Sequence, residues 1–202
     1  MALLLASNNA GKLCEVRALL ADLRVVSPAD LGIELDVEET GQTFAANAEL
    51  KARAYAAASG YIALADDSGL EVDALGGTPG VRSARYGAPD LDDEGRYLYL
   101  LSELQSYPEP SKRIARFRCA ISAISPDGRQ CRAEGTCEGL IAQSPTGSNG
   151  FGYDPVFFVP NHNATMAQLD AATKNSLSHR GQALAAVIPL LKSTFPELNI
   201  SL

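Results

Sequence analysis

Two adjacent aspartates, Asp66 and Asp67, follow the apolar run 61–65 and lead into Ser68 and Gly69. The run predicts a buried strand, and the two acids mark the point where that strand is expected to end in a loop. Neighbouring carboxylates at such a point repel each other unless a cation or a proton intervenes. Two interpretations stay open from these residues alone: a divalent-metal site, and a solvated turn of the kind that Asp, Ser and Gly commonly form.

Length and composition suit one compact domain over residues 1–202, or one domain with two lobes. The chain has 202 residues, of which 46% are hydrophobic, enough for a core without cross-links. Its formal charge of -7 argues against a protein that tracks the phosphates of a nucleic acid polymer, because such binding needs clustered Lys and Arg. An anionic ligand must therefore meet a local group of cations.

The sequence predicts a cytoplasmic protein without a membrane segment. No apolar stretch reaches spanning length, and the run from Ala2 to Ala6 has neither the basic start nor the length of a secretory signal. The four cysteines contain no C-x-x-C spacing, and Cys119 lies in step with Phe117 and Ile121 on one face of an alternating run. Structural thiols in a reducing compartment are favoured over a zinc site.

Periodicity along the chain predicts a mixed α/β fold. Residues 3–6 and 24–27 are expected to be strands, residues 43–59 a helix, and a helix with apolar residues at helical spacing is expected after Lys12. Further along, the expected elements are a short strand at 70–74, a helix opened by residues 92–94, two long strands at 113–124 and 131–142, a short strand at 156–159 and a C-terminal helix. Pro126-Asp127-Gly128 predicts a hairpin turn between the long strands. The expected architecture has helices packed on a sheet with parallel and antiparallel pairs.

The segment from Ser7 to Lys12 is the first candidate binding element. A polar turn, a glycine and a lysine stand at a predicted helix start, where free N–H groups and the helix dipole favour an anion. It is not a Walker A sequence, because the second glycine spacing and the Lys-Ser/Thr pair are missing. A phosphate cradle and an ordinary capped helix start both fit these residues.

An acidic pair, Glu38 and Glu39, precedes Thr40-Gly41. A carboxylate here would be able to join Asp66 or Asp67 around magnesium, which prefers oxygen ligands and keeps several waters. Solvated acids in a loop are the alternative. Three carboxylates near a lysine-bearing helix start are what a metal–nucleotide complex requires.

Two further segments carry groups suited to a nucleoside. The loop 147–155 sets Phe151 and Tyr153 among glycines, which allows the backbone to approach a flat ligand while a ring stacks on it; packing at a tight corner explains the same residues. Lys174 and the segment 178–181 add cations and donors at another helix start, either for phosphate and base oxygens or as a surface cap.

Six blocks together carry a family resemblance. They are Ser7-Asn8-Asn9-x-Gly11-Lys12, the 38–52 block with Glu38-Glu39-Thr40-Gly41, Asn47 and Lys51, Ala65-Asp66-Asp67-Ser68-Gly69-Leu70, Gly80-Val81-x-Ser83-Ala84-Arg85-Tyr86, Gly150-Phe151-Gly152-Tyr153-Asp154-Pro155, and Ser178-His179-Arg180-Gly181. In order and spacing the chain resembles the inosine/xanthosine triphosphate pyrophosphatase family, also called Ham1-like, over nearly its whole length.

The resemblance implies a two-lobed fold with a cleft between the lobes and a homodimeric, Mg²⁺-dependent hydrolase. Such an enzyme cleaves ITP, dITP and XTP to the monophosphate and pyrophosphate and so cleanses the nucleotide pool. By the same resemblance, Asp67 is the proton acceptor that activates water, and Glu38 and Asp67 hold Mg²⁺. The implied substrate-binding residues are Ser7, Asn8, Asn9, Ala10, Gly11, Lys12, Ser68, Phe151, Gly152, Tyr153, Asp154, Lys174, His179 and Arg180.

Two rival functions share these residues. A nucleotide-binding regulatory module would bind without turnover, and a related pyrophosphatase would act on modified pyrimidine nucleotides through a different base pocket. For a purine enzyme, the 6-carbonyl of hypoxanthine and xanthine separates them from adenine, and His179, Arg180 and backbone N–H groups of the glycine-rich loop are expected to read it.

Overall fold

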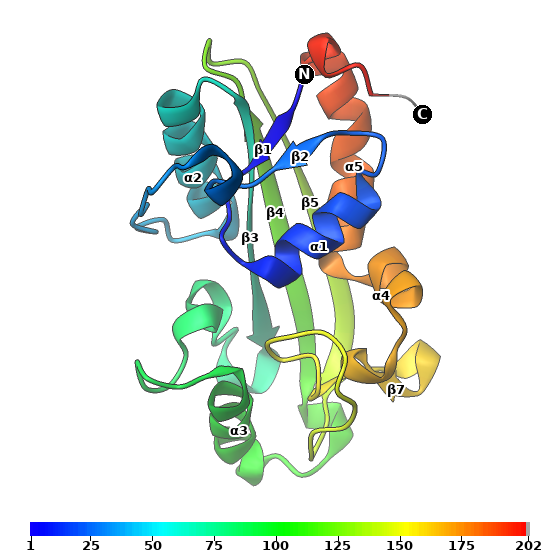
Figure 1. Cartoon of the computed structure of the whole chain (residues 1–202). Coiled ribbons are helices and arrows are strands. Elements are labelled where there is room, and N and C mark those ends of the chain that lie inside the picture. The colour runs from blue at the N-terminus through cyan, green and yellow to red at the C-terminus, as the bar shows by residue number, and fades with distance from the viewer. Residues whose placement is uncertain (201–202) are drawn as a thin grey trace. The chain divides into compact units, whose positions relative to one another are not determined.

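The computed structural model describes residues 1–200; helices and strands alternate from β1 to β4, four strands follow in succession from β4 to β7, and two helices come last (Figure 1). The strands are β1 (Leu3–Leu5), β2 (Val25–Val26), β3 (Ile62–Val72), β4 (Ile114–Ile124), β5 (Gln130–Ile141), β6 (Phe157–Val159) and β7 (Ala164–Thr165). The helices are α1 (Ala10–Leu19), α2 (Phe44–Ser59), α3 (Asp93–Glu103), α4 (Ala171–Leu177) and α5 (His179–Thr194), and short 3₁₀ helices link several of these elements. The predicted mixed α/β order is confirmed.

The strands form one open sheet in the order β2-β1-β3-β4-β5-β6-β7. β1 is parallel to both of its neighbours, with Leu3 opposite Val25 on β2 and Ile62 on β3. β6 is antiparallel to both β5 and β7. The predicted combination of parallel and antiparallel pairs is therefore confirmed.

The chain divides into two compact units that interleave along the sequence. The first comprises Met1–Asp67, Cys119–Gly135 and the described residues from His179 on, and the second comprises Ser68–Arg118 and Thr136–Ser178. β3, β4 and β5 each contribute residues to both units. The single domain and the cleft expected from the sequence stay predictions.

In the first unit, helices pack on both faces of the sheet because successive strand residues point to opposite faces. One core joins Leu3, Leu5, Ile62 and Leu64 of the strands to Val16 of α1, to Leu20 just after that helix, and to Leu184 and Val187 of α5. The other core joins Leu4, Ala63 and Ala65 to Ala52, Tyr55 and Ala56 of α2. Even-numbered positions of β3 thus face α1 and α5, and odd-numbered positions face α2.

Helix α2 begins and ends at local signals in the sequence. The Thr43 hydroxyl accepts a hydrogen bond of 3.1 Å from the backbone N–H of Ala46, which caps the first turn. Gly60 ends the helix with a φ of 71°, a left-handed conformation that glycine adopts without strain. The predicted helix over 43–59 is confirmed to within one residue.

The second unit has its own core. Asp92 caps α3 by accepting a hydrogen bond of 2.8 Å from the N–H of Gly95, and two acids occupy the first turn, as predicted. The buried apolar residues of this second core include Leu70 and Val72 of β3, Leu100 and Leu104 of the α3 region, Phe117 of β4, Ile141 of β5, and Val156 and Phe157. The rings of Phe117 and Phe157 lie 4.4 Å apart between centroids.

One prediction about β3 is wrong. The strand does not end at Asp66, and residues 70–74 do not begin a separate strand; β3 continues from Ile62 to Val72. The interpretation of the aspartate pair as a solvated turn is therefore wrong as well. The strand continues because Leu70 and Val72 are fully buried beyond the acids, and because the acids are charge-compensated inside the fold, as described below.

The turn between β4 and β5 is confirmed. The backbone N–H of Gly128 donates to the carbonyl of Ser125 at 2.9 Å, and Gly128 has a φ of 91°.

Among the residues described, no helix combines the length and the apolar character needed to cross a bilayer.

The cysteines divide into one exposed and three buried thiols. Cys14 is exposed, while Cys119, Cys131 and Cys137 are buried. Burial raises the pKa of Cys131 and of Cys137 to about 11. Within residues 1–200, no group of three or more His, Cys, Asp or Glu side chains is arranged to hold a metal. Cys119 is packed in the core, as the alternation around it predicted.

We predict that iodoacetamide labels one thiol of the native protein at pH 8, because Cys14 is exposed and the other three thiols are buried out of reach of the reagent. Mass spectrometry of the intact protein should show a single adduct, and the Cys14→Ser variant should show none. Urea-unfolded protein should accept four. Rapid labelling of a second cysteine in the native state would contradict the burial described here.

Candidate active site

The two aspartates point to opposite faces of β3. Asp66 continues the even-numbered series that faces α1 and α5, and Asp67 continues the odd-numbered series that faces α2. Both are buried, with exposed fractions of 2% and 7%. Two adjacent carboxylates are therefore kept apart by the strand itself, and each meets its own partners.

Asp67 is held by two residues of α2. Asn47 Nδ2 donates to Asp67 Oδ2 at 3.0 Å, and Lys51 Nζ lies 3.3 Å from Asp67 Oδ1. Lys51 also forms a 2.7 Å ion pair with Glu39, so its ammonium lies between two carboxylates. Asn47 and Lys51 are four residues apart, which places them on the same face of the helix.

The amide of Asn47 is itself fixed by the backbone. Asn47 is fully buried, and its Oδ1 accepts a hydrogen bond of 2.8 Å from the N–H of Gly41. This bond turns the NH₂ group toward Asp67. A Cβ at Gly41 would stand 2.5 Å from Asn47 Oδ1, so only glycine allows the loop to approach this closely.

Burial raises the pKa of Asp67 above its ordinary value, with Lys51 opposing the rise and Glu39 adding to it. Burial alone would lower the pKa of Lys51, but the charges of Asp67 and Asp66 outweigh it and the net shift is upward. The lysine is therefore cationic, and Asp67 binds a proton more readily than an ordinary aspartate. This combination suits a general base.

Asp66 meets different cations on the other face. Its Oδ2 lies 3.0 Å from Lys12 Nζ and accepts from Arg180 Nε and Nη2 at 3.2 and 3.1 Å. Arg180 Nη1 donates in turn to Glu15 of α1. Burial would raise the pKa of Asp66, but the charges of Lys12 and Arg180 outweigh it and hold that pKa below its ordinary value.

The start of α1 is a capped turn. The Asn9 side chain accepts from the backbone N–H of Lys12 at 3.0 Å, and the Ser7 hydroxyl accepts from the N–H of Asn9 at 3.2 Å. The capped-helix interpretation of this segment is thus confirmed. The cap also presents the Lys12 ammonium, whose side chain is 17% exposed, at the first turn.

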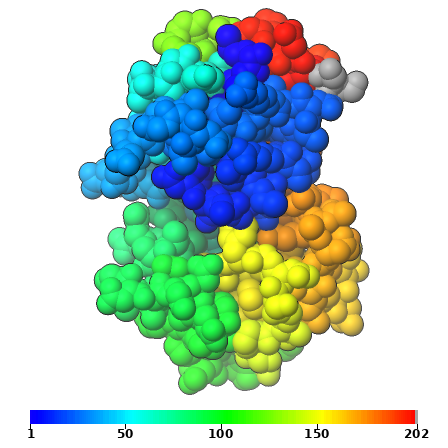
Figure 2. Space-filling view, in the orientation of Figure 1, coloured from blue at the N-terminus to red at the C-terminus, as the bar shows by residue number. Residues whose placement is uncertain are grey.

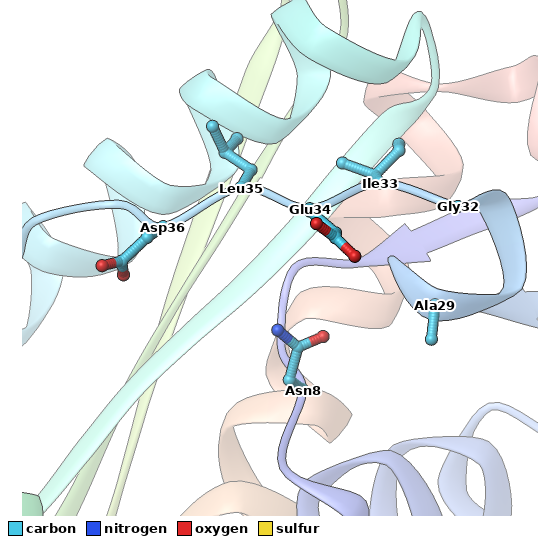
Figure 3. Close-up of a pocket in the computed structure, with 7 residues that line it drawn as sticks. All are labelled: Asn8, Ala29, Gly32, Ile33, Glu34, Leu35 and Asp36. Carbon is cyan, nitrogen blue, oxygen red and sulfur yellow. The ribbon is translucent and has the colours of Figure 1, made fainter.

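A pocket of about 750 Å³ lies beside this turn within the first unit (Figure 3). It is lined by Asn8, Ala29, Gly32, Ile33, Glu34, Leu35 and Asp36. The side chains of Asn8 and Glu34 point toward each other, whereas Ile33 and Leu35 point away toward α2 and pack on the core there (Figure 3). The volume is in the range of small-molecule sites.

Glu38 and Glu39, which follow the pocket-lining segment in the sequence, point in different directions. From Leu31 to Glu39 the side chains alternate between half-buried and exposed, and the segment lies at the surface of its unit (Figure 2). Glu39 is in phase with the inward-facing positions and reaches Lys51, whereas Glu38 is exposed and forms no ion pair within the described part of the chain.

In the second unit, the glycine-rich loop is organised around Asp154. Lys174 Nζ lies 2.6 Å from Asp154 Oδ2 and 4.7 Å from the centre of the Phe151 ring. The N–H of Phe151 donates to the same carboxylate oxygen at 2.9 Å. A Cβ at Gly150, whose φ is 79°, would stand 2.0 Å from that oxygen, so glycine is required there. The tight-corner packing weighed for this loop is present.

Tyr153 and Gly152 are also engaged. The Tyr153 hydroxyl donates to the carbonyl of Ser83 at 2.8 Å, and burial raises the pKa of this tyrosine. The N–H of Gly152 donates to Asp93 at 2.8 Å. The backbone N–H groups of Phe151 and Gly152, expected from the sequence to read a base, therefore donate to carboxylates in this structure.

The structure sorts the residues selected from sequence into two groups. The first unit holds Ser7 to Lys12, Glu38, Asp67, His179 and Arg180, and the second unit holds Ser68, Phe151 to Asp154, and Lys174. Sequence reasoning gave no role to Glu15, named Asn47 and Lys51 only as members of a motif, and considered Glu39 as a magnesium ligand and not as the partner of Lys51. The i, i+4 spacing of Asn47 and Lys51 was a usable signal, because it marks a polar pair on an otherwise small and apolar helix face.

Comparisons with known proteins agree with these motifs. A model of the Ham1 family matches residues 3–190. The dITP/XTP pyrophosphatase of Desulforamulus reducens is 49% identical over 197 residues, covering 96% of this chain and 98% of that protein, and the one of Nostoc sp. is 50% identical over 191 residues, covering 93% and 92%. The Ham1 protein structures of Staphylococcus aureus and Coxiella burnetii match with TM-scores of 0.85 and 0.86, each at 42% identity and covering 96% of this chain and 99% of theirs.

We predict that Asn47→Leu lowers the free energy of unfolding by about 2–3 kcal/mol, because it leaves the Gly41 N–H and the Asp67 carboxylate without their buried partner. Urea unfolding measures the loss. Leu50→Ala, at a 39% exposed position of the same helix, is the matched control and should change stability by about 0.5 kcal/mol or less. Equal effects of the two substitutions would show that Asn47 does not hold this site together.

Proposed function

The chain belongs to the Ham1 family, and we propose that it is a nucleoside triphosphate pyrophosphatase that hydrolyses ITP, dITP and XTP to the monophosphate and pyrophosphate. The observation that carries the proposal is the contrast between the adjacent aspartates. Asp67 has a raised pKa and contacts Lys51, while Asp66 is ion-paired beside it to the lysine of the α1 turn. One stretch of strand thus carries a base and, next to it in sequence, the carboxylate that holds the cation proposed to bind phosphate.

The chemistry follows from these roles. Asp67 takes a proton from a water molecule, and the water oxygen attacks the α-phosphorus. The bond between that phosphorus and the α,β-bridging oxygen breaks, and pyrophosphate leaves with the electron pair. Lys12 and the turn from Ser7 to Gly11 bind the phosphate chain, where positive charge offsets the charge on the non-bridging oxygens.

Mg²⁺ is the cofactor we propose, held by Glu38 and Asp67. In support of the proposal, Glu39 and Asp67 converge on one cationic atom, Lys51 Nζ, which brings the 38–39 segment close to Asp67, and carboxylate oxygens are the ligands this ion prefers. Glu39 is charge-compensated by Lys51, so Glu38 is the acid whose charge is available to a metal. When bound, the ion supplies further neutralisation of phosphate oxygens.

We assign the nucleoside to the candidate residues of the second unit, which are Ser68, Phe151 to Asp154 and Lys174. The family resemblance adds His179 and Arg180. Phe151 offers a ring face, and the Lys174–Asp154 pair offers a donor and an acceptor beside it. A homodimer in the cytoplasm, acting on small nucleotides and not on nucleic acid polymers or membranes, completes the proposal.

The function is tested with a panel of canonical, deaminated and modified pyrimidine triphosphates in the presence of Mg²⁺, with pyrophosphate and orthophosphate measured separately. We expect pyrophosphate from ITP, dITP and XTP at rates about 10²-fold above those for ATP. Nucleotide binding without any product would indicate a regulatory module. Preferential cleavage of modified pyrimidines, or equal turnover of ATP and ITP, would overturn the proposed specificity.

We predict that Asp67→Asn lowers turnover of ITP by about 10²-fold or more, because the amide cannot accept the proton from water. Affinity for ITP should change much less, which calorimetry on the variant measures. Near-normal turnover by this variant would remove Asp67 from the reaction.

A matched pair of substitutions tests the metal assignment. We predict that Glu38→Gln raises the Mg²⁺ concentration for half-maximal activity by about tenfold, the loss expected for one charged ligand. Glu39→Gln removes the same charge from the neighbouring position and should shift it by much less. A larger shift for Glu39→Gln would move the metal ligand to that residue.

A further inference from the structure

Four ionic groups, two buried and two half-buried, form a continuous chain on the α1 and α5 face of β3. The order is Lys12, Asp66, Arg180 and Glu15, and the side chains are 17%, 1%, 3% and 12% exposed. We refer to these four residues as the Asp66 ion cluster. All of them belong to the first unit, and together they carry two positive and two negative charges.

We propose that Asp66 is a positioning residue for Lys12: it fixes the ammonium at the α1 turn, and Arg180 keeps Asp66 from neutralising it. The proposal rests on the proposed function in taking the α1 turn as the phosphate site. It assigns roles to Asp66 and Glu15 that the family resemblance did not, and gives Arg180 a task besides substrate contact.

The geometry allows Asp66 to hold the Lys12 ammonium in place without cancelling its positive charge. A single carboxylate oxygen, Asp66 Oδ2, lies within 3.2 Å of Lys12 Nζ and of two nitrogens of Arg180. A lysine has four flexible methylenes and loses much freedom when it is held, so a fixed partner pays that entropy before a ligand arrives. Because Arg180 shares the same oxygen, the negative charge of Asp66 is divided between two cations.

Glu15 completes the arrangement from the far end of Arg180. It accepts from Nη1, while Nε and Nη2 face Asp66, so each side of the planar guanidinium is engaged by a carboxylate. Glu15 lies on α1, one turn after Lys12. The cluster therefore links the turn at the start of α1, the strand β3 and the start of α5 by charge as well as by packing.

Charge repulsion and positioning predict opposite changes in phosphate affinity for the substitution Asp66→Asn. Asp66→Asn removes a negative charge near an anion site, so Coulomb repulsion alone predicts tighter phosphate binding. If Asp66 positions Lys12, the same substitution frees the ammonium and weakens binding. The sign of the change therefore decides between the two.

The experiment measures binding of inorganic tripolyphosphate by calorimetry, in EDTA so that metal binding does not contribute, in a double-mutant cycle. We expect about tenfold weaker binding for Lys12→Ala and a loss of about the same size for Asp66→Asn. In the Lys12→Ala background, Asp66→Asn should leave the affinity unchanged or increase it, since there is no ammonium left to position.

Glu34→Gln is the matched control. Glu34 faces Asn8 in the pocket beside the same turn, and it forms no ion pair with any other residue from 1 to 200 (Figure 3). Removing its charge relieves repulsion only, so tripolyphosphate should bind as tightly as to the wild type or more tightly. Tighter binding by Asp66→Asn as well would overturn the proposal.

If Asp66→Asn does not fold, Asp66→Glu decides the matter. This variant keeps every charge and moves the carboxylate by one methylene, so about fivefold or greater weakening reports geometry alone, and unchanged affinity overturns the proposal. Because the readout is binding of tripolyphosphate, the outcome is separate from the proposed reaction. If the wild-type protein binds tripolyphosphate but hydrolyses none of the nucleotides in the panel, the proposed function is contradicted. The double-mutant cycle of Lys12 and Asp66 can still be interpreted in that case.

Discussion

The alternation of side chains along one buried strand is the constraint on which the site depends. Because β3 continues through Asp66 and Asp67, the two carboxylates face different helices and form their ion pairs with different cations. Lys12 and Arg180 compensate the first, and Lys51 with Asn47 compensates the second. Each charge is buried only because its partners are already in place, since an unpaired buried carboxylate would be very costly.

This division gives identical side chains different chemistry. Asp66 accepts hydrogen bonds and ion pairs from two cations, so its charged form is stabilised and its pKa falls. Asp67 faces one lysine that it shares with Glu39, and burial dominates, so its pKa rises. A residue that stays charged can serve as an anchor, and a neighbour that takes up protons more readily can serve as a base.

Much of the fold was predictable from sequence, because local signals decide it: the helix over 43–59, the turn at Gly128 and the apolar alternation around Cys119 were all predicted correctly. The course of β3 was not, because a rule based on apolar runs ends a strand at charged residues. The compensating cation Arg180 lies 114 residues from Asp66 in sequence, and no local pattern reveals such a pairing. The family resemblance supplied the candidate residues, but Asn47 and Lys51 became visible as partners of Asp67 only once α2 was placed on the odd-numbered face of β3.

The most direct test of this account is the titration of both carboxylates by carbon-detected NMR on the metal-free protein, with Asp66→Asn and Asp67→Asn used for assignment. The account predicts that the Asp66 carboxylate titrates below the ordinary pKa of an aspartate and the Asp67 carboxylate above it. Two adjacent aspartates that shift in the same direction, or that titrate together as a coupled pair, would contradict the separation of roles across β3.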